Sequence, residues 1–217
     1  MKYFTKADLE HLPSRQRSHL INSISGYKSA HLIGSSSLSG STNLAVFNSV
    51  FHLGSSPALL GFILRPLTVE RHTYDNLKAT SSYTLNAITK EMYREAHHTS
   101  AKYPVNISEF SITSFEETYK DGFSTPYVKQ SPVQIGCRYV NEYTIKENGC
   151  IMVVGAVEHI YVASELLHQD HWVHLDRANI MSIIGLDGYA LPKILDRLEY
   201  ARPNQKSKSL LNGPQKD

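Results

Sequence analysis

Residues 133–162 read VQIGCRYVNEYTIKENGCIMVVGAVEHIYV and contain two segments with the composition of β-strands. Both segments are rich in valine, isoleucine and tyrosine, residues that favour an extended backbone. Asn148-Gly149 lies between them, and this dipeptide between two apolar runs is a strong signal for a tight turn. The stretch therefore predicts a long antiparallel β-hairpin in which Val133–Ile145 pairs with Cys150–Val162.

The sequence on the N-terminal side of this hairpin predicts further short strands. Apolar runs bounded by glycine, proline or serine place them at 30–36, 42–51, 59–64 and 83–88. Helices are expected between Ser14 and Gly26, over Thr73–Ala79 with Thr73 as the N-cap, and over Thr89–His98. Strands outnumber helices and tight turns join them, so the predicted fold class is mainly β, an antiparallel barrel with peripheral helices.

Two segments lack these patterns. Residues 104–131 contain many turn formers and little periodicity, which predicts a long excursion over the surface. Residues 204–217 are polar, carry lysines and have few large apolar groups, which predicts a disordered tail. No internal repeat divides the remainder, so residues 1–203 are expected to form a single domain.

The composition excludes several classes of protein. The net charge of the 217 residues is +2, and residues 203–217 alone carry that charge, so a dedicated nucleic-acid surface is not expected. No apolar run approaches the roughly 18 to 20 residues of a membrane span, and no signal peptide opens the chain. The two cysteines are too few for a disulfide-rich scaffold and too far apart for a CxxC pair. We expect a cytoplasmic protein that contacts neither nucleic acid nor membrane.

The spacing of the glycines excludes the common phosphate-binding loops. No two of the twelve glycines are separated by two, four or five positions. The dinucleotide motif G-x-G-x-x-G, the Walker A loop and the G-x-S-x-G nucleophile elbow are therefore all absent. A phosphate site in this chain must use side chains and isolated backbone N–H groups.

Polar side chains interrupt the predicted strand at 42–51. Asn43, Asn48 and Ser49 stand among its apolar residues, and amide and hydroxyl groups can hydrogen-bond to the edge of a heteroaromatic ring. An exposed strand face with ordinary polar alternation is the alternative, which the pattern alone favours. Tyr189, which follows a Gly-Leu-Asp-Gly turn, is a second candidate for contact with a planar ligand, although a tyrosine that caps the core is as common.

Two arginines and a threonine follow one of the buried-strand candidates. Arg65, Arg71 and Thr73 lie within nine residues of one another. Guanidinium groups bind phosphate through paired hydrogen bonds, and a helix N-terminus adds free N–H groups. This is the composition of a phosphate site without a glycine loop. A solvated helix start with Arg71 paired to Glu70 or Asp75 is equally consistent with the residues.

The histidines do not predict a metal site. His97 and His98 are neighbours, and adjacent residues of a helix point about 100° apart. His168, His171 and His174 are spaced by three, but they fall in a polar segment beside the only tryptophan, which favours a solvent-facing loop or helix. No Ser/His/Asp arrangement is evident, so we predict neither a metal ligand nor a catalytic side chain.

Seven short motifs occur along the chain in a fixed order: LINSISGYKSA (20–30), LIG (32–34), TNLA (42–45), RP (65–66), ERHTY (70–74), SAKYP (100–104) and GLD (185–187). Each motif alone is weak, but the ordered set resembles the flavin-reductase-like family with the FMN-binding split barrel. The resemblance covers nearly the whole chain. Members of this family include flavoredoxins and the reductase components of two-component monooxygenases.

This resemblance implies a homodimer of six-stranded Greek-key split barrels with FMN near the subunit interface. The family's ring-binding segment falls on Asn43, Val46, Asn48, Ser49 and Val50. Its phosphate region falls on Arg65, Arg71, Thr73 and, on the following strand, Asn86. A loop and an aromatic residue that approach the flavin correspond to Ser100, Lys102 and Tyr189.

The resemblance also implies a reaction, hydride transfer from NAD(P)H as a transient co-substrate to FMN. The acceptor is then free flavin, ferric iron, oxygen or a partner protein such as a monooxygenase. Two positions depart from the family: Ala190 stands where relatives often carry histidine, and Asn48 where many carry serine. An FMN carrier or sensor, or a flavoprotein reduced by a partner, shares the same FMN residues. A split barrel for haem or a pyridoxal-type ligand is the third alternative, with axial candidates His52, His72, His97, His98 and His159.

Overall fold

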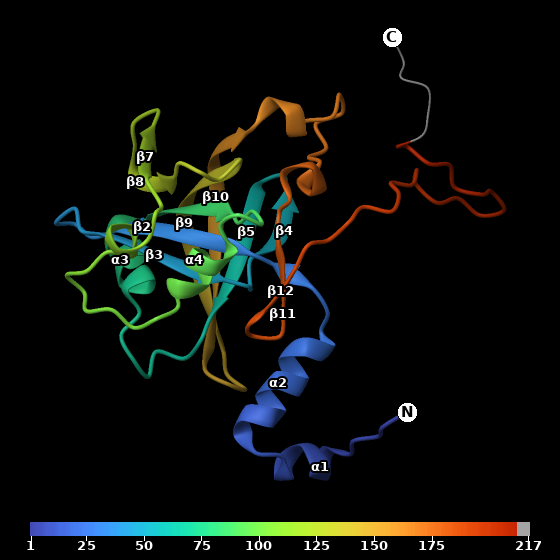
Figure 1. Cartoon of the computed structure of the whole chain (residues 1–217), viewed down its shortest axis with the longest axis horizontal. Helices are drawn as coiled ribbons and strands as arrows, with labels where there is room; N and C mark the ends of the chain where they lie inside the picture. The colour runs from blue at the N-terminus through green and yellow to red at the C-terminus, as the bar shows by residue number, and fades with distance from the viewer. Residues whose placement is uncertain (212–217) are drawn as a thin grey trace.

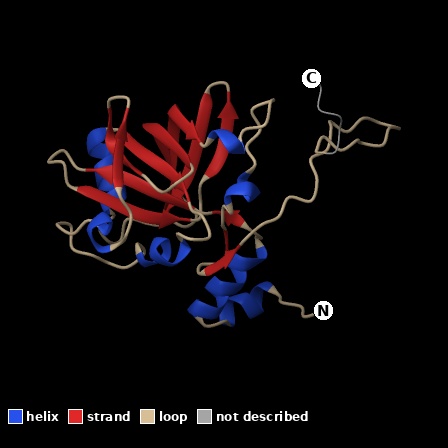
Figure 2. Ribbon diagram, turned by 45° about the horizontal axis from the view of Figure 1, so that its top comes forward, coloured by secondary structure: helices blue, strands red, loops and turns tan. Residues whose placement is uncertain are grey.

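The computed structural model describes residues 1–211 and is built around one large antiparallel sheet (Figures 1 and 2). Its strand order is β3 (Thr42–Phe47), β2 (His31–Ser36), β6 (Ser82–Ala87), β9 (Val133–Ile145), β10 (Cys150–Val162), β5 (Ala58–Leu64) and β4 (Phe51–Ser55). A smaller sheet contains β1 (Lys28–Ser29), β11 (Ser182–Ile184) and β12 (Gly188–Ala190). A two-stranded sheet contains β7 (Glu117–Lys120) and β8 (Phe123–Val128).

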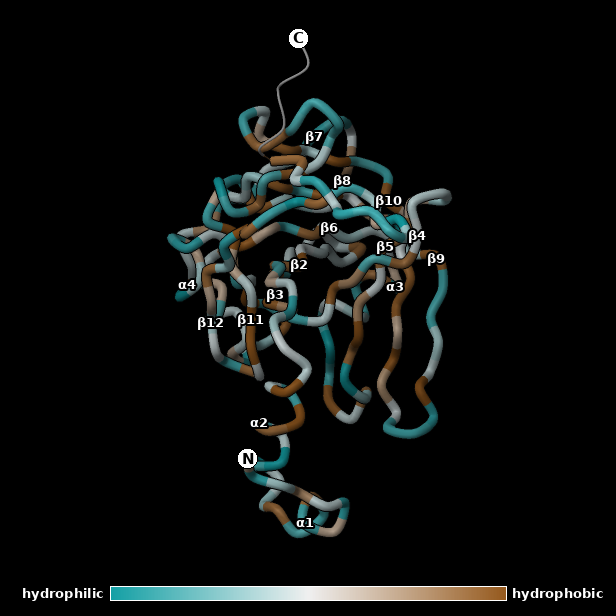
Figure 3. Tube along the Cα trace, turned by 90° about the vertical axis from the view of Figure 1, so that its right-hand side faces the viewer, coloured by the Kyte–Doolittle hydropathy of each residue, from teal (hydrophilic) through white to brown (hydrophobic). Residues whose placement is uncertain are grey.

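The helices are short and lie outside the sheet. They are α1 (Lys6–His11), α2 (Ser14–Ile24), α3 (His72–Thr80), α4 (Tyr93–His98) and α5 (Glu109–Ile112), with 3₁₀ turns η1 (Ser164–Leu166) and η2 (Leu175–Ala178). Helices α1 and α2 project away from the barrel, and neither contains a buried residue (Figures 1 and 3). Within residues 1–211 no helix is long and apolar enough to cross a membrane.

The mainly β class is confirmed, and β9 and β10 have the predicted bounds. The predicted single strand at 42–51 is wrong, because β3 ends at Phe47 and β4 begins at Phe51. The large sheet consequently has seven strands in place of the expected six.

Barrel closure explains this break. The two ends of the sheet meet where the chain leaves β3. The Phe47 and Phe62 ring centroids are 5.4 Å apart in an edge-to-face arrangement. The Ser49 hydroxyl donates to the carbonyl of Ile63 at 2.9 Å and accepts from its N–H at 3.2 Å. Ser49 therefore satisfies backbone groups of β5 that a continuous strand would leave unpaired.

Apolar side chains from both ends of the sheet fill the barrel. Phe62 and Tyr83 are fully buried, with ring centroids 5.4 Å apart. Cys137 belongs to the same cluster, and burial raises the pKa of its thiol to about 12. Because the thiolate is the reactive form, this cysteine is a packing residue.

The predicted surface excursion at 104–131 holds for its many exposed residues but is wrong for α5 and β8. It contains α5 and the β7–β8 hairpin, and Tyr127 and Val128 of β8 are fully buried. The hydroxyl of Thr84 in β6 donates to the carbonyl of Pro126 at 2.7 Å, which ties β8 to the barrel. Turn formers in this segment mark a hairpin whose burial depends on distant strands.

Three helix starts also differ from prediction. Pro13 occupies the N-cap of α2, so Ser14 is already helical. Arg71 occupies the N-cap of α3, and Thr73 lies inside the helix with its side chain bonded elsewhere. Helix α4 begins only at Tyr93. Each error comes from choosing the nearest residue with a capping side chain.

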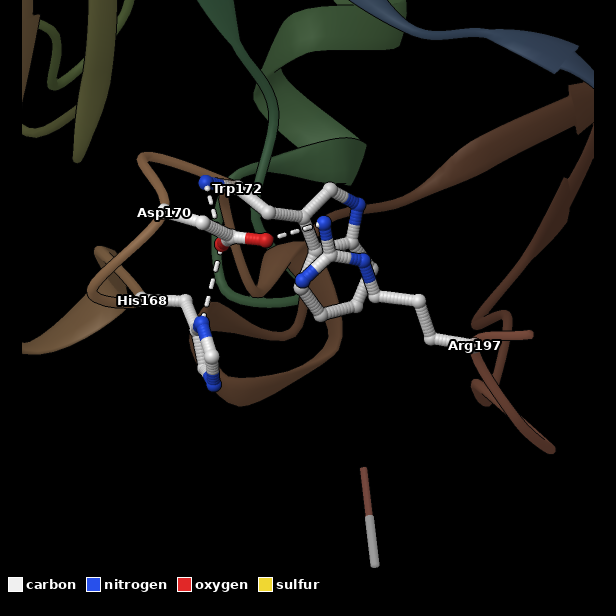
Figure 4. A network of polar contacts seen from close by, with 4 residues as sticks. All are labelled: His168, Asp170, Trp172 and Arg197. Atoms are coloured by element: carbon white, nitrogen blue, oxygen red, sulfur yellow. Dashed lines mark hydrogen bonds and ion pairs between the residues drawn. The ribbon is translucent and has the colours of Figure 1, made fainter. Parts of the chain in front are cut away.

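The histidine-bearing segment 168–174 contacts the chain that follows the barrel. Asp170 accepts hydrogen bonds from Arg197 Nη2 at 2.5 Å and His168 Nδ1 at 2.9 Å (Figure 4). The guanidinium carbon of Arg197 lies 4.8 Å from the Trp172 ring centroid. Arg197 holds the pKa of the Asp170 carboxyl well below its usual range. The segment thus anchors the C-terminal extension.

We expect Arg197→Ala to detach this extension from segment 168–174. The pKa of Asp170 then moves up toward its ordinary value, because its charged donor is lost. An NMR pH titration of the Asp170 carboxyl measures the change. Arg202→Ala is the matched control, since no contact joins Arg202 to Asp170. A pKa unchanged in Arg197→Ala contradicts the assignment.

The predicted disordered tail lies partly outside the described residues. Residues 204–211 fold back on the extension, where Leu198 and Ser209 form an isolated bridge and Glu199 N–H donates to the Lys208 carbonyl at 3.0 Å. Residues 212–217 lie beyond the part of the chain that the structure describes.

His31, at the start of β2, makes the stability of the fold depend on pH. Its Nδ1 atom is buried without a partner, and burial lowers the pKa of the ring from 6.5 to about 4. Between these values the unfolded chain binds a proton that the folded chain does not, so stability falls as the pH falls. The two pKa values correspond to a loss of about 2 to 3 kcal/mol at pH 4.5. Urea unfolding at pH 7 and pH 4.5 measures this loss of stability. If His31→Gln loses as much stability between the two pH values as the wild type, His31 is not its source.

Candidate functional site

A cavity of about 690 Å³ opens where β3, the end of β5, the start of α3 and the turn between β11 and β12 meet. Cavities that bind small molecules typically measure about 300–1,000 Å³. Ten of the twelve residues predicted for the site line this cavity: Asn43, Val46, Asn48, Ser49, Arg65, Arg71, Thr73, Ser100, Lys102 and Tyr189. Val50 and Asn86 do not.

Three cations without partners surround one end of the cavity. Arg65 follows β5, Arg71 precedes α3 and Lys102 follows α4. In residues 1–211 none of the three side chains forms an ion pair, and Arg71 Nε is buried with no hydrogen-bond partner. The expected alternative, Arg71 paired with Glu70 or Asp75, is not observed. A buried, unpartnered guanidinium N–H fits an anionic ligand, because leaving it unpaired is costly.

The start of α3 adds further donors to this end. No side chain caps this nine-residue helix, and the first N–H groups of a helix have no helical acceptor. The buried Thr73 hydroxyl accepts a hydrogen bond from Asn43 Nδ2 at 3.0 Å, so its own proton is free to donate. The arginines, the helix start and this hydroxyl together fit a phosphate group.

The polar residues after β3 hold the wall of the cavity. Asn48 Nδ2 donates to the Gly185 carbonyl at 3.1 Å, which fixes the turn before β12. Ser49 bridges the backbone of β5. The Val50 carbonyl accepts from the Ser29 hydroxyl at 2.6 Å, and its side chain packs on the barrel core. Val50 does not line the cavity, because the chain turns into the barrel there, and its role as a ring contact stays a prediction.

Asn86 lies inside the fold and does not line the cavity, and its role near the phosphate stays a prediction. It is fully buried, and its Nδ2 donates to the Leu32 carbonyl at 3.2 Å and the Thr84 hydroxyl at 2.9 Å. Its Oδ1 accepts from the N–H of Val128 at 3.0 Å. Through these three hydrogen bonds the Asn86 side chain joins β6 to β2 and β8.

Tyr189 and His97 meet at the opposite wall. The Tyr189 hydroxyl lies 3.2 Å from His97 Nδ1, and its ring centroid lies 5.4 Å from that of Tyr93. Burial raises the pKa of Tyr189 to about 12, so the phenol keeps its proton, and the tautomer of His97 decides which of the two groups donates. His97 was not predicted as a contact of Tyr189, because the two residues lie 92 positions apart in the chain.

Glu109 is the second lining residue that sequence reasoning missed. It lines the cavity, is 5% exposed, and accepts from the Leu44 N–H at 2.9 Å through Oε2. Burial raises the pKa of its carboxyl. Its position after Ser108, which caps α5, was the available signal. The wrong surface-loop prediction for this segment concealed it.

A second cavity of about 730 Å³ lies beyond α4. Its charged lining consists of Glu91, Glu95, Glu165 and Arg177, a mainly acidic set that does not suit a phosphate. Among residues 1–211 no group of three or more histidine, cysteine or acidic residues is placed to hold a metal ion.

Comparison with known proteins identifies the family. The flavin reductase like domain matches residues 24–178, and the chain belongs to this family of flavin-related oxidoreductases. A split-barrel protein from Shewanella frigidimarina NCIMB 400, assigned as a flavin reductase, is 38% identical over 93% of this chain and 100% of that chain, with a TM-score of 0.89. No curated protein matches the chain.

More distant solved structures share the fold. Nitrilotriacetate monooxygenase component B from Bacillus cereus has a TM-score of 0.79 at 17% identity, over 91% of this chain and 98% of that chain. The flavoredoxin of Desulfovibrio vulgaris (Miyazaki F) has a TM-score of 0.69 at 15% identity, over 79% of this chain and 90% of that chain. The split-barrel fold of the present chain is therefore established.

Proposed function

We propose that this protein binds FMN in the cavity beside α3 and catalyses its reduction by NAD(P)H. The observation that carries the proposal is the buried Arg71 Nε without a partner, next to an uncapped helix start. The FMN phosphate binds there, with Arg65 and Lys102 supplying further charge. The isoalloxazine ring lies along the wall formed by the end of β3 and Tyr189. Family membership supports the flavin as the ligand.

The chain's own residues bind and orient the reactants. When bound, the flavin supplies hydride acceptance and onward electron transfer. The chain has no glycine-rich loop that would bind a dinucleotide at a separate site. NAD(P)H therefore binds on the open side of the flavin cavity. The His97–Tyr189 hydrogen bond fixes the aromatic wall. No side chain acts as a covalent catalyst. The acceptor is free flavin, ferric iron, oxygen or a partner protein.

We further propose a cytoplasmic homodimer. Ile21, Ile24 and Tyr27, on and just beyond α2, are 45%, 69% and 69% exposed, and a second copy would cover them. A monooxygenase is the proposed partner protein, which the similarity to nitrilotriacetate monooxygenase component B supports.

Anaerobic mixing with a nicotinamide tests the reductase activity. We expect the visible flavin absorption of the FMN-loaded protein to bleach on addition of NADH or NADPH, faster than that of free FMN at the same concentration. Absorption that persists with both nicotinamides contradicts the reductase. In that case an FMN carrier, or a flavoprotein reduced by a partner, is the better assignment. Ala190, which stands where relatives often carry histidine, is the sequence difference that motivates this alternative.

A further inference from the structure

A buried carboxylate lies at the anion-binding end of the cavity. Glu109 is 5% exposed, and one of its oxygens is held by the N–H of Leu44 at 2.9 Å. A buried ionised carboxylate is normally paired, because removing the charge from water is costly. Within residues 1–211 Glu109 has no cationic group within 4.0 Å. Its ionisation is therefore sensitive to any charge that enters the cavity.

Two consecutive residues of β3 connect this carboxylate to the start of α3. The N–H of Leu44 binds Glu109, and the side chain of Asn43 binds Thr73. Against the effect of burial, His72, the first residue of α3, lies close enough to Glu109 to lower the pKa of its carboxyl, and Glu109 lines the same cavity as the donors that fit a phosphate. The other charged and titratable groups lining the cavity are Arg65, Glu70, Arg71, His72, His97 and Lys102. Behind β3, the Glu117 carboxylate of β7 accepts from the Thr42 hydroxyl at 2.6 Å.

A phosphate and an ionised Glu109 in the same cavity repel one another. The neutral carboxyl removes the repulsion and adds a donor. Burial raises the pKa of Glu109, which brings the neutral form toward mildly acidic conditions. The cations at the cavity end attract the phosphate in either state, so the protonation of Glu109 modulates binding without abolishing it.

We propose that Glu109 sets the selectivity of the cavity for phosphorylated over unphosphorylated ligands. Its ionised form weakens phosphate binding and its neutral form permits it. Phosphate binding and Glu109 protonation then favour each other, as thermodynamic linkage requires. This inference rests on the proposed binding of FMN, and it adds a carboxylate to a site otherwise defined by its cations.

The substitution Glu109→Gln removes the charge and keeps an oxygen for the Leu44 N–H. Dissociation constants for FMN and riboflavin are measured by flavin fluorescence from pH 5 to pH 8 in both proteins. The phosphate of FMN titrates near pH 6, equally in both titrations, so the comparison isolates Glu109. At pH 8 we expect E109Q to bind FMN about tenfold more tightly than the wild type. The difference between the two proteins narrows as the pH falls, and riboflavin affinity is the same in both throughout.

Equal FMN affinities at pH 8, or weaker binding by E109Q with riboflavin unchanged, overturn the inference. A wild-type protein that binds neither flavin overturns the proposed function and the inference together, so the two failures are distinguishable. If E109Q does not fold, the double variant His72→Gln/His97→Gln replaces it. Its affinity for sulfate, which stays a dianion over this range, must rise from pH 8 to pH 5. A flat or falling sulfate affinity overturns the inference.

Discussion

Replacing Arg71 with alanine weakens FMN binding by about 10- to 100-fold, the loss expected when a phosphate loses a charge-assisted hydrogen-bond donor. Within residues 1–211 the Nε atom of Arg71 is buried and has no hydrogen-bond partner, so its N–H is available to the ligand. Riboflavin, which lacks the phosphate, binds both proteins equally. Fluorescence titration with the two flavins measures both expectations.

The matched control for Arg71→Ala is Arg138→Ala. Arg138 is an exposed arginine paired with Glu158 at 2.7 Å and does not line the cavity. This variant leaves FMN affinity unchanged. Arg71→Lys retains the charge but not the planar fork, and its affinity falls between those of the wild type and Arg71→Ala. An Arg71→Ala protein that binds FMN as tightly as the wild type refutes the phosphate assignment.

Replacing Gly34 with alanine destabilises the fold by about 3 kcal/mol, or prevents folding, because overpacking at a rigid contact forces two strands apart. A Cβ atom at this position lies 2.5 Å from the carbonyl oxygen of Pro126 and 2.6 Å from the hydroxyl of Thr84. Those two atoms are hydrogen-bonded to each other at 2.7 Å, and one belongs to the backbone, so neither can move aside cheaply. Urea unfolding measures the loss.

Gly54→Ala is the control for this substitution. Gly54 lies in edge strand β4, where the nearest atom to an added Cβ is the Pro57 carbonyl oxygen at 3.2 Å. We expect its free energy of unfolding to change by less than about 1 kcal/mol, as for a contact that can relax. Equal effects at Gly34 and Gly54 contradict the packing of β8 against β2 and β6.

The sequence predicted correctly those elements whose contacts join residues close together in the chain. The β9–β10 hairpin has an Asn-Gly turn between two apolar runs, and its bounds match the prediction. The break at residues 48–50 was missed because Ser49 bonds to Ile63, a contact that exists only when the barrel closes. The burial of β8 was missed for the same reason, since its partners are distant strands.

The candidate site shows the same division. Arg65, Arg71 and Thr73 lie close together in sequence, and the structure brings them to one end of the cavity. Asn86 does not line the cavity, and a buried asparagine that joins strands is indistinguishable in sequence from one that binds a ligand. Glu109 was missed because the surface excursion predicted at 104–131 concealed the signal that Ser108 caps α5.

Titration of the purified wild-type protein with FMN is the most direct test of flavin binding at the cavity beside α3. Saturable binding of one FMN per chain, with riboflavin bound markedly more weakly at pH 5 to 6, is the predicted result. It is the outcome of a phosphate held by Arg65, Arg71 and the start of α3. FMN binding that is absent, or equal to that of riboflavin at every pH, would contradict the assignment of this cavity.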